Sequence, residues 1–242
     1  MKVLILCGGR GIQLKEGGEL IQKALIPIGG STMIHTIMKH FSFYGITDFI
    51  LCVDSKGHEI KASLEDQNLS EQEKKNMSGW NIRFLETGDS VMTGARILKA
   101  KDLLGDEDFF VSYIDTLADI NISKLLQTHK AKGCVLTMTG VHPMTYLGVI
   151  SHEEGYVTGF DVTAKISSTI KGGYFICKPK IFDYLSDDPG CALEDTPLKR
   201  LIEEKEVALF DHDGFWKHLD FFKDLEHLKK LTTEDNPSWI IR

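Results

Sequence analysis

The chain has 242 residues, of which 42% are hydrophobic and 26% are charged, and its formal net charge is -7. This composition predicts a globular protein with a sizeable core, and the acidic balance disfavours a nucleic-acid-binding protein, for which a basic face is typical. No apolar stretch approaches the roughly 20 residues of a membrane-spanning helix. From the charge and from this length we therefore expect neither a nucleic acid nor a membrane as partner.

The first part of the chain alternates predicted strands with predicted helices. Continuous apolar runs, such as the one at 2–7, are typical of parallel strands that are buried on both faces. The polar segment 67–80 is expected to be an excursion between the helix at 57–66 and the segment "NIRFLE" at 81–86. In chain order, the expected elements are strand 2–7, helix 32–45, strand 48–53, helix 57–66, helix 93–104, strand 108–115, helix 122–133 and strand 134–141. This alternation favours an α/β fold with a mostly parallel sheet and helices on both faces.

The pattern changes near Tyr146, where the chain becomes richer in short strands. A hairpin is predicted over 146–161 with its turn at Glu153, Glu154 and Gly155. The apolar segment 172–179, a helix at 193–206, a strand at 207–212 and a segment 215–220 that runs into a last helix complete the chain. We therefore predict one domain over 1–242, with a core at about 1–140 and a β-rich C-terminal addition at about 141–242.

The five cysteines are predicted to be buried and unpaired. Four lie in apolar, strand-like runs, and no two have a spacing typical of metal ligands. Their odd number and the absence of a signal-peptide pattern favour a reducing, cytoplasmic location.

A glycine-rich segment follows the first predicted strand. Gly8, Gly9 and Gly11 would let backbone N–H groups approach a phosphate closely. The spacings of the P-loop and of the dinucleotide-binding fingerprint are both absent, so a tight turn without a ligand is an equal alternative. Lys23 lies beyond a polar loop, where it is either a phosphate-binding cation or an ordinary surface lysine.

Two aspartates end predicted strands. Asp115 and Asp220 each stand at a strand-to-helix junction, and the carboxyl ends of strands are where ligands bind in open α/β sheets. If the two converge, they could hold Mg²⁺, which takes few carboxylates plus substrate phosphates. Helix capping is the alternative for such residues, and Asp119 is the better capping candidate for the helix at 122–133.

Five stretches of sequence together resemble a known family. They are "LILCGGRGIQL", "TGDSVMTGARILKAKDLL" from Thr87, "SYIDTLADI", "KGGYF" and "GFWKHLD". These are similar to the LAGGxGTRL, TGDSxMTGGRLKR, YGDGVAD, NGGFF and GFWxxMD segments of the sugar-1-phosphate nucleotidyltransferases. The chain most closely resembles the glucose-1-phosphate cytidylyltransferases within that family, and the likeness extends from Met1 to about Trp239.

The resemblance implies a Rossmann-like nucleotide-binding core in which a sugar phosphate attacks CTP and pyrophosphate leaves. It assigns catalysis to Lys23, Arg96, Asp115 and Asp220, the two aspartates also holding the Mg²⁺ cofactor. The residues to which it assigns nucleotide binding are Leu6, Gly8, Gly9, Gly11, Gln13, Thr87, Gly88, Asp89, Ser90 and Thr93. It assigns acceptor binding to Lys165, Lys171, Gly172 and Gly173. It also implies that the protein forms a homo-oligomer.

The departures from the family pattern leave several functions open. Gln13 stands where the family has an arginine, so a bidentate cationic clamp on the leaving pyrophosphate is lost. Val162, Thr163 and Ala164 replace a Glu-Lys-Pro segment at the acceptor end, where Lys165 is a candidate substitute, and Lys171 replaces an asparagine. Glucose 1-phosphate is the default acceptor, with another phosphorylated or phosphonylated compound as the alternative. A nucleotide-binding protein without transferase activity is the second class, and a dehydrogenase, which lacks its fingerprint here, is the third.

Overall fold

The computed structural model describes residues 1–8, 14–16, 19–66, 69–145, 147–220, 222–234 and 239 of the chain. The predicted nucleotide-binding residues Gly9, Gly11 and Gln13 lie outside the described residues. Leu6 and Gly8, at the start of the same segment, lie inside them.

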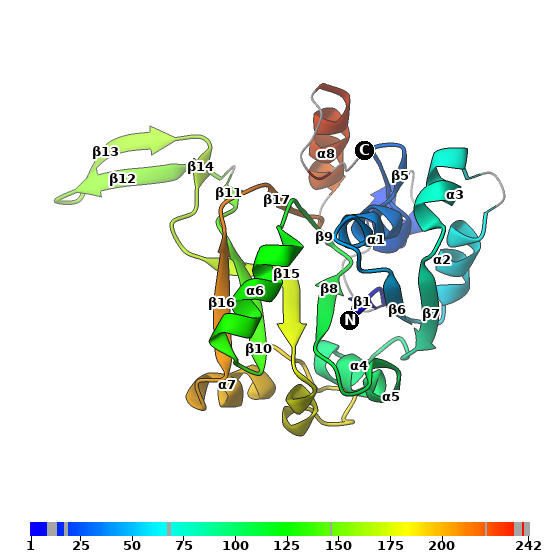
Figure 1. Cartoon of the computed structure of the whole chain (residues 1–242). Helices are drawn as coiled ribbons and strands as arrows, with labels where there is room; N and C mark the ends of the chain where they lie inside the picture. The colour runs from blue at the N-terminus through cyan, green and yellow to red at the C-terminus, as the bar shows by residue number, and fades with distance from the viewer. Residues whose placement is uncertain are drawn as a thin grey trace.

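A seven-stranded sheet with the order β16-β10-β15-β8-β1-β6-β7 forms the centre of the molecule (Figure 1). Its strands are β1 (Lys2–Leu6), β6 (Asp48–Val53), β7 (Asn81–Glu86), β8 (Phe109–Tyr113), β10 (Leu136–Val141), β15 (Ile170–Cys177) and β16 (Val207–His212). Strand β15 runs antiparallel to both of its neighbours, whereas all other neighbouring pairs are parallel. The predicted α/β fold with a mostly parallel sheet is therefore confirmed.

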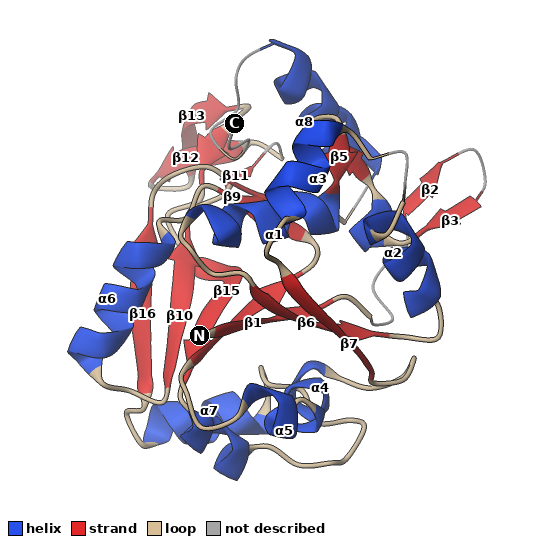
Figure 2. Ribbon diagram, turned by 45° about the vertical axis from the view of Figure 1, so that its right-hand side comes forward, coloured by secondary structure: helices blue, strands red, loops and turns tan. Residues whose placement is uncertain are grey.

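Both faces of the sheet are covered, which explains why its strands have continuous apolar sequences. In β1, Val3 and Ile5 point to one core cluster, whereas Leu4 and Leu6 point to the other. Helices contribute buried side chains to one face or the other, and Figure 2 shows them on opposite sides of the sheet. The first face is covered by α1 (Met33–Phe43), α2 (Gly57–Leu64), α6 (Ile122–Lys132) and α8 (Phe222–Glu234), and the second by α4 (Thr93–Lys99), α5 (Lys101–Leu104) and α7 (Thr196–Glu203).

The helices differ from the expectations at two places. Helix α3 (Glu71–Met77) lies in the segment 67–80 that was expected to be a polar excursion. Its N-terminus is a capping box, in which the Ser70 side chain accepts from the Glu73 backbone and Glu73 accepts from Ser70. The helix predicted at 93–104 is divided at Ala100 into α4 and α5.

The C-terminal part supplies two strands of the main sheet as well as a projecting hairpin. The hairpin consists of β12 (Val149–Glu153) and β13 (Tyr156–Asp161) and extends away from the body (Figure 1). The remaining short elements are β2 (Leu14–Glu16), β3 (Glu19–Ile21), η1 (Lys23–Leu25), β4 (Pro27–Ile28), β5 (Ser31–Thr32), β9 (Thr116–Ala118), β11 (Met144–Thr145), β14 (Ala164–Lys165), η2 (Pro179–Tyr184) and β17 (Trp216–His218). Among the described residues, no helix has the length and apolar character that crossing a membrane would require.

Candidate active site

A cavity of about 980 Å³ lies at the carboxyl ends of the parallel strands. Gly8 follows β1, Asp54 follows β6 and Asp115 follows β8, and all three line the cavity. Because β15 is antiparallel to β8, it brings its first residues, including Lys171 and Gly173, to the same edge of the sheet. Open α/β sheets bind ligands at this edge.

Lys23 and Asp115 line this cavity, and Asp220 joins them through an ion pair with Lys23. Lys23 Nζ lies 3.2 Å from Asp115 Oδ2 and 3.1 Å from Asp220 Oδ1, and its side chain is only 10% exposed. The two aspartates are brought together because β17 pairs antiparallel with β9, and the Leu219 N–H donates to the Asp115 carbonyl at 2.8 Å. The convergence that the sequence left open is therefore observed, and Lys23 is not a free surface lysine.

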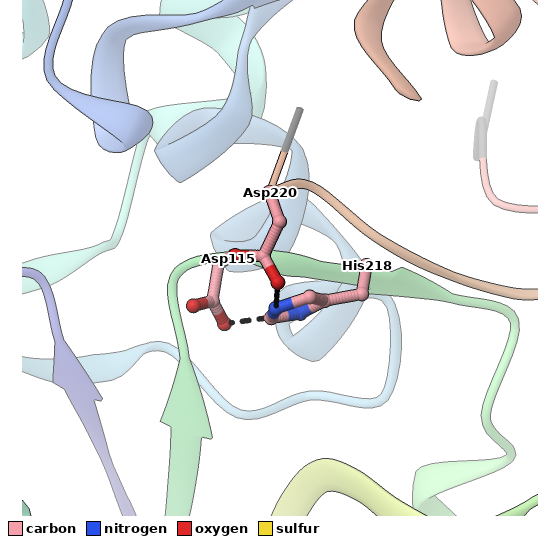
Figure 3. Close-up of side chains that lie close together, drawn as sticks. All are labelled: Asp115, His218 and Asp220. Carbon is pink, nitrogen blue, oxygen red and sulfur yellow. Dashed lines mark ion pairs between the residues drawn. The ribbon is translucent and has the colours of Figure 1, made fainter. Parts of the chain in front are cut away.

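His218 approaches the same two aspartates through their other oxygens (Figure 3). Its Nε2 lies 2.9 Å from Asp220 Oδ2, and its Nδ1 lies 3.6 Å from Asp115 Oδ1. Sequence reasoning did not assign this histidine. The available signal was its position two residues before Asp220, since side chains two positions apart share one face of an extended segment.

The residues present fit a divalent cation of the kind that the family resemblance implies. One ligand atom each from Asp115, His218 and Asp220 lies within 4.8 Å of the other two. Asp115 Oδ1 is buried and has no hydrogen-bond partner among the described residues, which is a costly state for a carboxylate oxygen unless a cation is held there. Two carboxylates and an imidazole can hold such a cation.

Asp119 does not cap helix α6, so the capping prediction was wrong. The cap is Asn121, whose side chain accepts from the Lys124 N–H at 2.9 Å. Asp119 Oδ1 instead lies 3.0 Å from His212 Nε2. The asparagine is the residue that immediately precedes the first turn, where its side-chain oxygen can reach an unpaired N–H group.

Arg96 organises the turn that follows β7. Its side chain is 1% exposed. It donates to the Val91 and Gly88 carbonyls at 2.8 Å each and also to the Thr87 hydroxyl. An added Cβ at Gly8 would lie 2.6 Å from Arg96 Nη1, so the guanidinium packs directly against the segment after β1. A glycine at position 8 therefore allows the two predicted nucleotide-binding segments to approach closely.

Asp89 anchors the same turn from the opposite side. Its carboxylate accepts from the Ser55 N–H at 2.8 Å and from the Ser55 hydroxyl at 3.1 Å. These hydrogen bonds lower the pKa of Asp89. The turn is thus held between the end of β6 and helix α4, with Asp89, Ser90 and Thr93 facing the cavity.

Glu194 is the centre of a polar network in the wall of the cavity. Its carboxylate accepts from the Tyr113 hydroxyl at 2.6 Å and from the Thr93 hydroxyl at 2.8 Å, and it pairs with Lys171. Lys171 Nζ also lies 5.0 Å from the centre of the Tyr113 ring. Burial raises the pKa of Glu194, but hydrogen bonds from Lys171 and Tyr113 outweigh it, so the net shift is downward and the group remains a carboxylate.

Most of the predicted residues that the structure describes line one cavity. They are Leu6, Gly8, Lys23, Asp89, Ser90, Thr93, Arg96, Asp115, Lys171 and Gly173. Thr87 and Gly88 accept hydrogen bonds from Arg96, and the Gly172 carbonyl accepts from Trp216 Nε1 at 2.8 Å. Asp220 does not line the cavity itself but pairs with Lys23, which does. Lys165 does not line the cavity, and its Nζ lies 3.8 Å from Asp213 Oδ1.

Among the lining residues that were not assigned from the sequence, three lie beside the predicted acceptor residues. Glu194, Tyr113 and Trp216 all contact predicted acceptor residues or lie beside them. Trp216 lay within the quoted "GFWKHLD" segment, which is a usable signal. Tyr113 lay within the quoted "SYIDTLADI" segment, which is likewise a usable signal. Glu194 lies in none of the quoted segments, and no local pattern distinguishes it from other residues.

Known proteins are similar to this chain along nearly its whole length. The family model for nucleotidyl transferases matches residues 2–234. The chain is 38% identical, over 251 residues and 99% of both chains, to the probable glucose-1-phosphate cytidylyltransferase of Bacillus subtilis. It is 32% identical, over 254 residues, 99% of this chain and 98% of the relative, to the glucose-1-phosphate cytidylyltransferase of Salmonella typhi.

Solved structures share the fold at lower identity. HddC from Yersinia pseudotuberculosis has a TM-score of 0.71 and 19% identity, with 95% of this chain and 98% of that chain covered. A putative glucose-1-phosphate thymidylyltransferase from Bacillus anthracis has a TM-score of 0.73 and 16% identity, with 98% of each chain covered. With a family model that spans nearly the whole sequence, the chain belongs to the nucleotidyl transferase family.

Proposed function

We propose that this chain is a nucleotidyltransferase that transfers CMP from CTP to a phosphorylated small acceptor, with glucose 1-phosphate as the default acceptor. The observation that carries the proposal is that Lys23, which lines a cavity of about 980 Å³ together with Asp115, is paired with both Asp115 and Asp220. The full-length relatives from Bacillus subtilis and Salmonella typhi, which bear this activity in their names, support the choice of substrates.

We propose that the cavity has a nucleotide end and an acceptor end, which receive the two substrates. The turn 87–93 and Gly8 form the nucleotide end within residues 1–140. Lys171 and Gly173, from residues 141–242, form the acceptor end together with Glu194. In this arrangement the acceptor phosphate oxygen attacks the α-phosphorus of CTP, the bond from that phosphorus to the β-phosphate oxygen breaks, and pyrophosphate leaves.

The chain's own residues contribute positioning and positive charge to this reaction. Lys23 is held by two carboxylates at a point facing the cavity, where its ammonium group can neutralise charge on the reacting phosphates. A Mg²⁺ ion bound by Asp115 and Asp220 would add charge neutralisation at the same phosphates. Arg96 keeps the turn 87–91 in place through three hydrogen bonds, and we propose that its effect on catalysis is one of positioning.

Lys171 is our candidate for the cation that binds the acceptor phosphate. It is paired with Glu194 at the edge of the cavity, whereas Lys165 is turned toward Asp213. An acceptor dianion would compete with Glu194 for Lys171, and the released carboxylate could accept hydrogen bonds from the acceptor's hydroxyl groups. A phosphonate carries the same charged oxygens, so a phosphonylated compound is the alternative acceptor.

The test is a pyrophosphate-release screen of the four nucleoside triphosphates against phosphorylated and phosphonylated acceptors. We expect release with CTP and glucose 1-phosphate, and a higher KM for the acceptor in Lys171→Gln with little change in the KM for CTP. Lys180→Gln is the matched control, because Lys180 also pairs with a glutamate, Glu206 at 3.2 Å, but lies outside the cavity. Equal effects of the two substitutions would contradict the role of Lys171.

The same screen separates the proposal from the alternative function. A protein that binds CTP in a calorimetric titration but releases no pyrophosphate with any acceptor would be a nucleotide-binding homologue without transferase activity. Pyrophosphate release only with a phosphonylated acceptor would support the proposed reaction but show that the acceptor is a phosphonate and not glucose 1-phosphate.

We also propose that the chain forms a homo-oligomer, as the family resemblance implies. The hairpin of β12 and β13 exposes apolar side chains that support this, among them Ile150 at 57%, Tyr156 at 78% and Phe160 at 61%. Light scattering coupled to size-exclusion chromatography measures the assembly directly, and a monomer at all accessible concentrations would contradict it.

A further inference from the structure

Each of the two carboxylates of the site, Asp115 and Asp220, has one oxygen near Lys23 and the other near His218. Lys23 takes Oδ2 of Asp115 and Oδ1 of Asp220, whereas His218 faces Oδ1 of Asp115 and Oδ2 of Asp220. Each aspartate therefore keeps one oxygen for the lysine and presents the other toward the imidazole. On this second side, Asp115 Oδ1 is buried and lacks a hydrogen-bond partner within the part of the chain that the structure describes.

The imidazole of His218 is held in this position by its neighbours. His218 ends β17, where it is the register partner of Thr116 in β9. Its ring lies nearly parallel to that of Trp216, with an interplanar angle of 5° and a centroid separation of 6.1 Å. The indole is itself fixed by its hydrogen bond to the Gly172 carbonyl. A ring fixed by packing can present a nitrogen without first losing much conformational freedom.

We propose that His218 is a third protein ligand of the divalent cation, beside Asp115 Oδ1 and Asp220 Oδ2, and that it gives the site a preference for Mn²⁺ over Mg²⁺. Mg²⁺ binds oxygen ligands and keeps several waters, so an imidazole adds little to its binding. Mn²⁺ shares the carboxylate and water ligands of Mg²⁺, but as a first-row transition ion it accepts an imidazole nitrogen more readily than Mg²⁺ does. Lys23 remains on the two other carboxylate oxygens.

This inference rests on the cation site of the proposed function, but it is tested without CTP or acceptor. Mn²⁺ is titrated into the purified protein, and binding is followed by electron paramagnetic resonance. Mg²⁺ affinity is obtained by competition. The spin-echo spectrum of bound Mn²⁺ reports directly whether an imidazole nitrogen is coordinated, which a merely structural histidine would not change.

The variants are His218→Gln and the matched control His142→Gln. His142 also lies beside two aspartates, with Nε2 2.8 Å from Asp211 Oδ1, but this group is outside the cavity. We expect nitrogen modulation in the wild type that disappears in His218→Gln, with Mn²⁺ affinity lowered about tenfold or more, since even ligand-orienting residues contribute tenfold to a hundredfold. Mg²⁺ affinity should change little, and His142→Gln should match the wild type.

Three results would overturn the inference. They are the absence of nitrogen modulation in wild-type Mn²⁺ spectra, an equal loss of Mn²⁺ and Mg²⁺ affinity in His218→Gln, and the absence of any Mn²⁺ binding without nucleotide. Pyrophosphate release with Mg²⁺ in any of these cases would leave the proposed transferase function intact. Thermal unfolding of each variant checks that the fold is retained.

Discussion

Replacing Gly173 by alanine should damage both the fold and the site, and the structure allows the size of the effect to be worked out. Gly173 has a φ of +79°, a region in which an L-residue costs about 1–2 kcal/mol. An added Cβ would lie 2.7 Å from the hydroxyl oxygen of Thr116, where ordinary contact begins at 3.4 Å. Thr116 is buried, so this overpacking should cost a further 1–3 kcal/mol or so.

Gly45→Ala is the matched control for this substitution. Gly45 has a φ of +77°, and an added Cβ there would meet no described atom within 4 Å. Both variants therefore carry the backbone strain, and only Gly173→Ala carries the contact. In urea unfolding we expect a difference of about 1–3 kcal/mol between the two variants, which corresponds to roughly 2–12 °C in Tm for a chain of this size.

The same contact links the substitution to catalysis. Thr116 must move by about 0.7 Å to restore an ordinary contact, and it directly follows Asp115. Because a displacement of about 1 Å near reacting groups can cost about a hundredfold in rate, we expect kcat to fall tenfold to about a hundredfold in Gly173→Ala and to stay unchanged in Gly45→Ala. Equal stability and equal pyrophosphate release for the two variants would refute this reasoning.

Three further predictions concern charge and protonation. Asp115→Asn and Asp220→Asn should each lower kcat by orders of magnitude while circular dichroism stays native, and near-normal pyrophosphate release by either would remove that aspartate from the site. Glu194→Gln should raise the KM for the acceptor more than that for CTP, because the partner of Lys171 loses its charge; an equal change in both constants would contradict this. Burial lowers the pKa of His40 below its ordinary 6.5, so the unfolded chain binds the proton more readily and stability should fall as the pH drops below that value. Thermal melts between about pH 5 and pH 7 measure this loss, and His40→Gln should reduce it, whereas an unchanged pH dependence in that variant would exclude His40 as its source.

The sequence by itself determined the strands and the layered α/β arrangement. A strand that is covered on both faces needs apolar side chains at consecutive positions, so runs such as 2–7 and 48–53 are identifiable without tertiary information. Helix α3 was predictable too, since Ser70 and Glu73 have the spacing of a capping box. It has no buried residues, so a prediction based on apolar periodicity does not detect it. The positions of Lys23, Asp115 and Asp220 beside strand ends or glycine-rich segments likewise marked them as candidates.

Only the tertiary structure decided which of these candidates share a site. Asp115 and Asp220 meet because β9 pairs with β17, a contact between segments about a hundred positions apart, and local spacing carries no information about such a pairing. The antiparallel placement of β15 in the main sheet brings Lys171 to the cavity, where it pairs with Glu194. His218 acquires its role in the same way, because a histidine gains its chemistry from the carboxylates placed around it, and long-range strand pairing determines where those carboxylates lie.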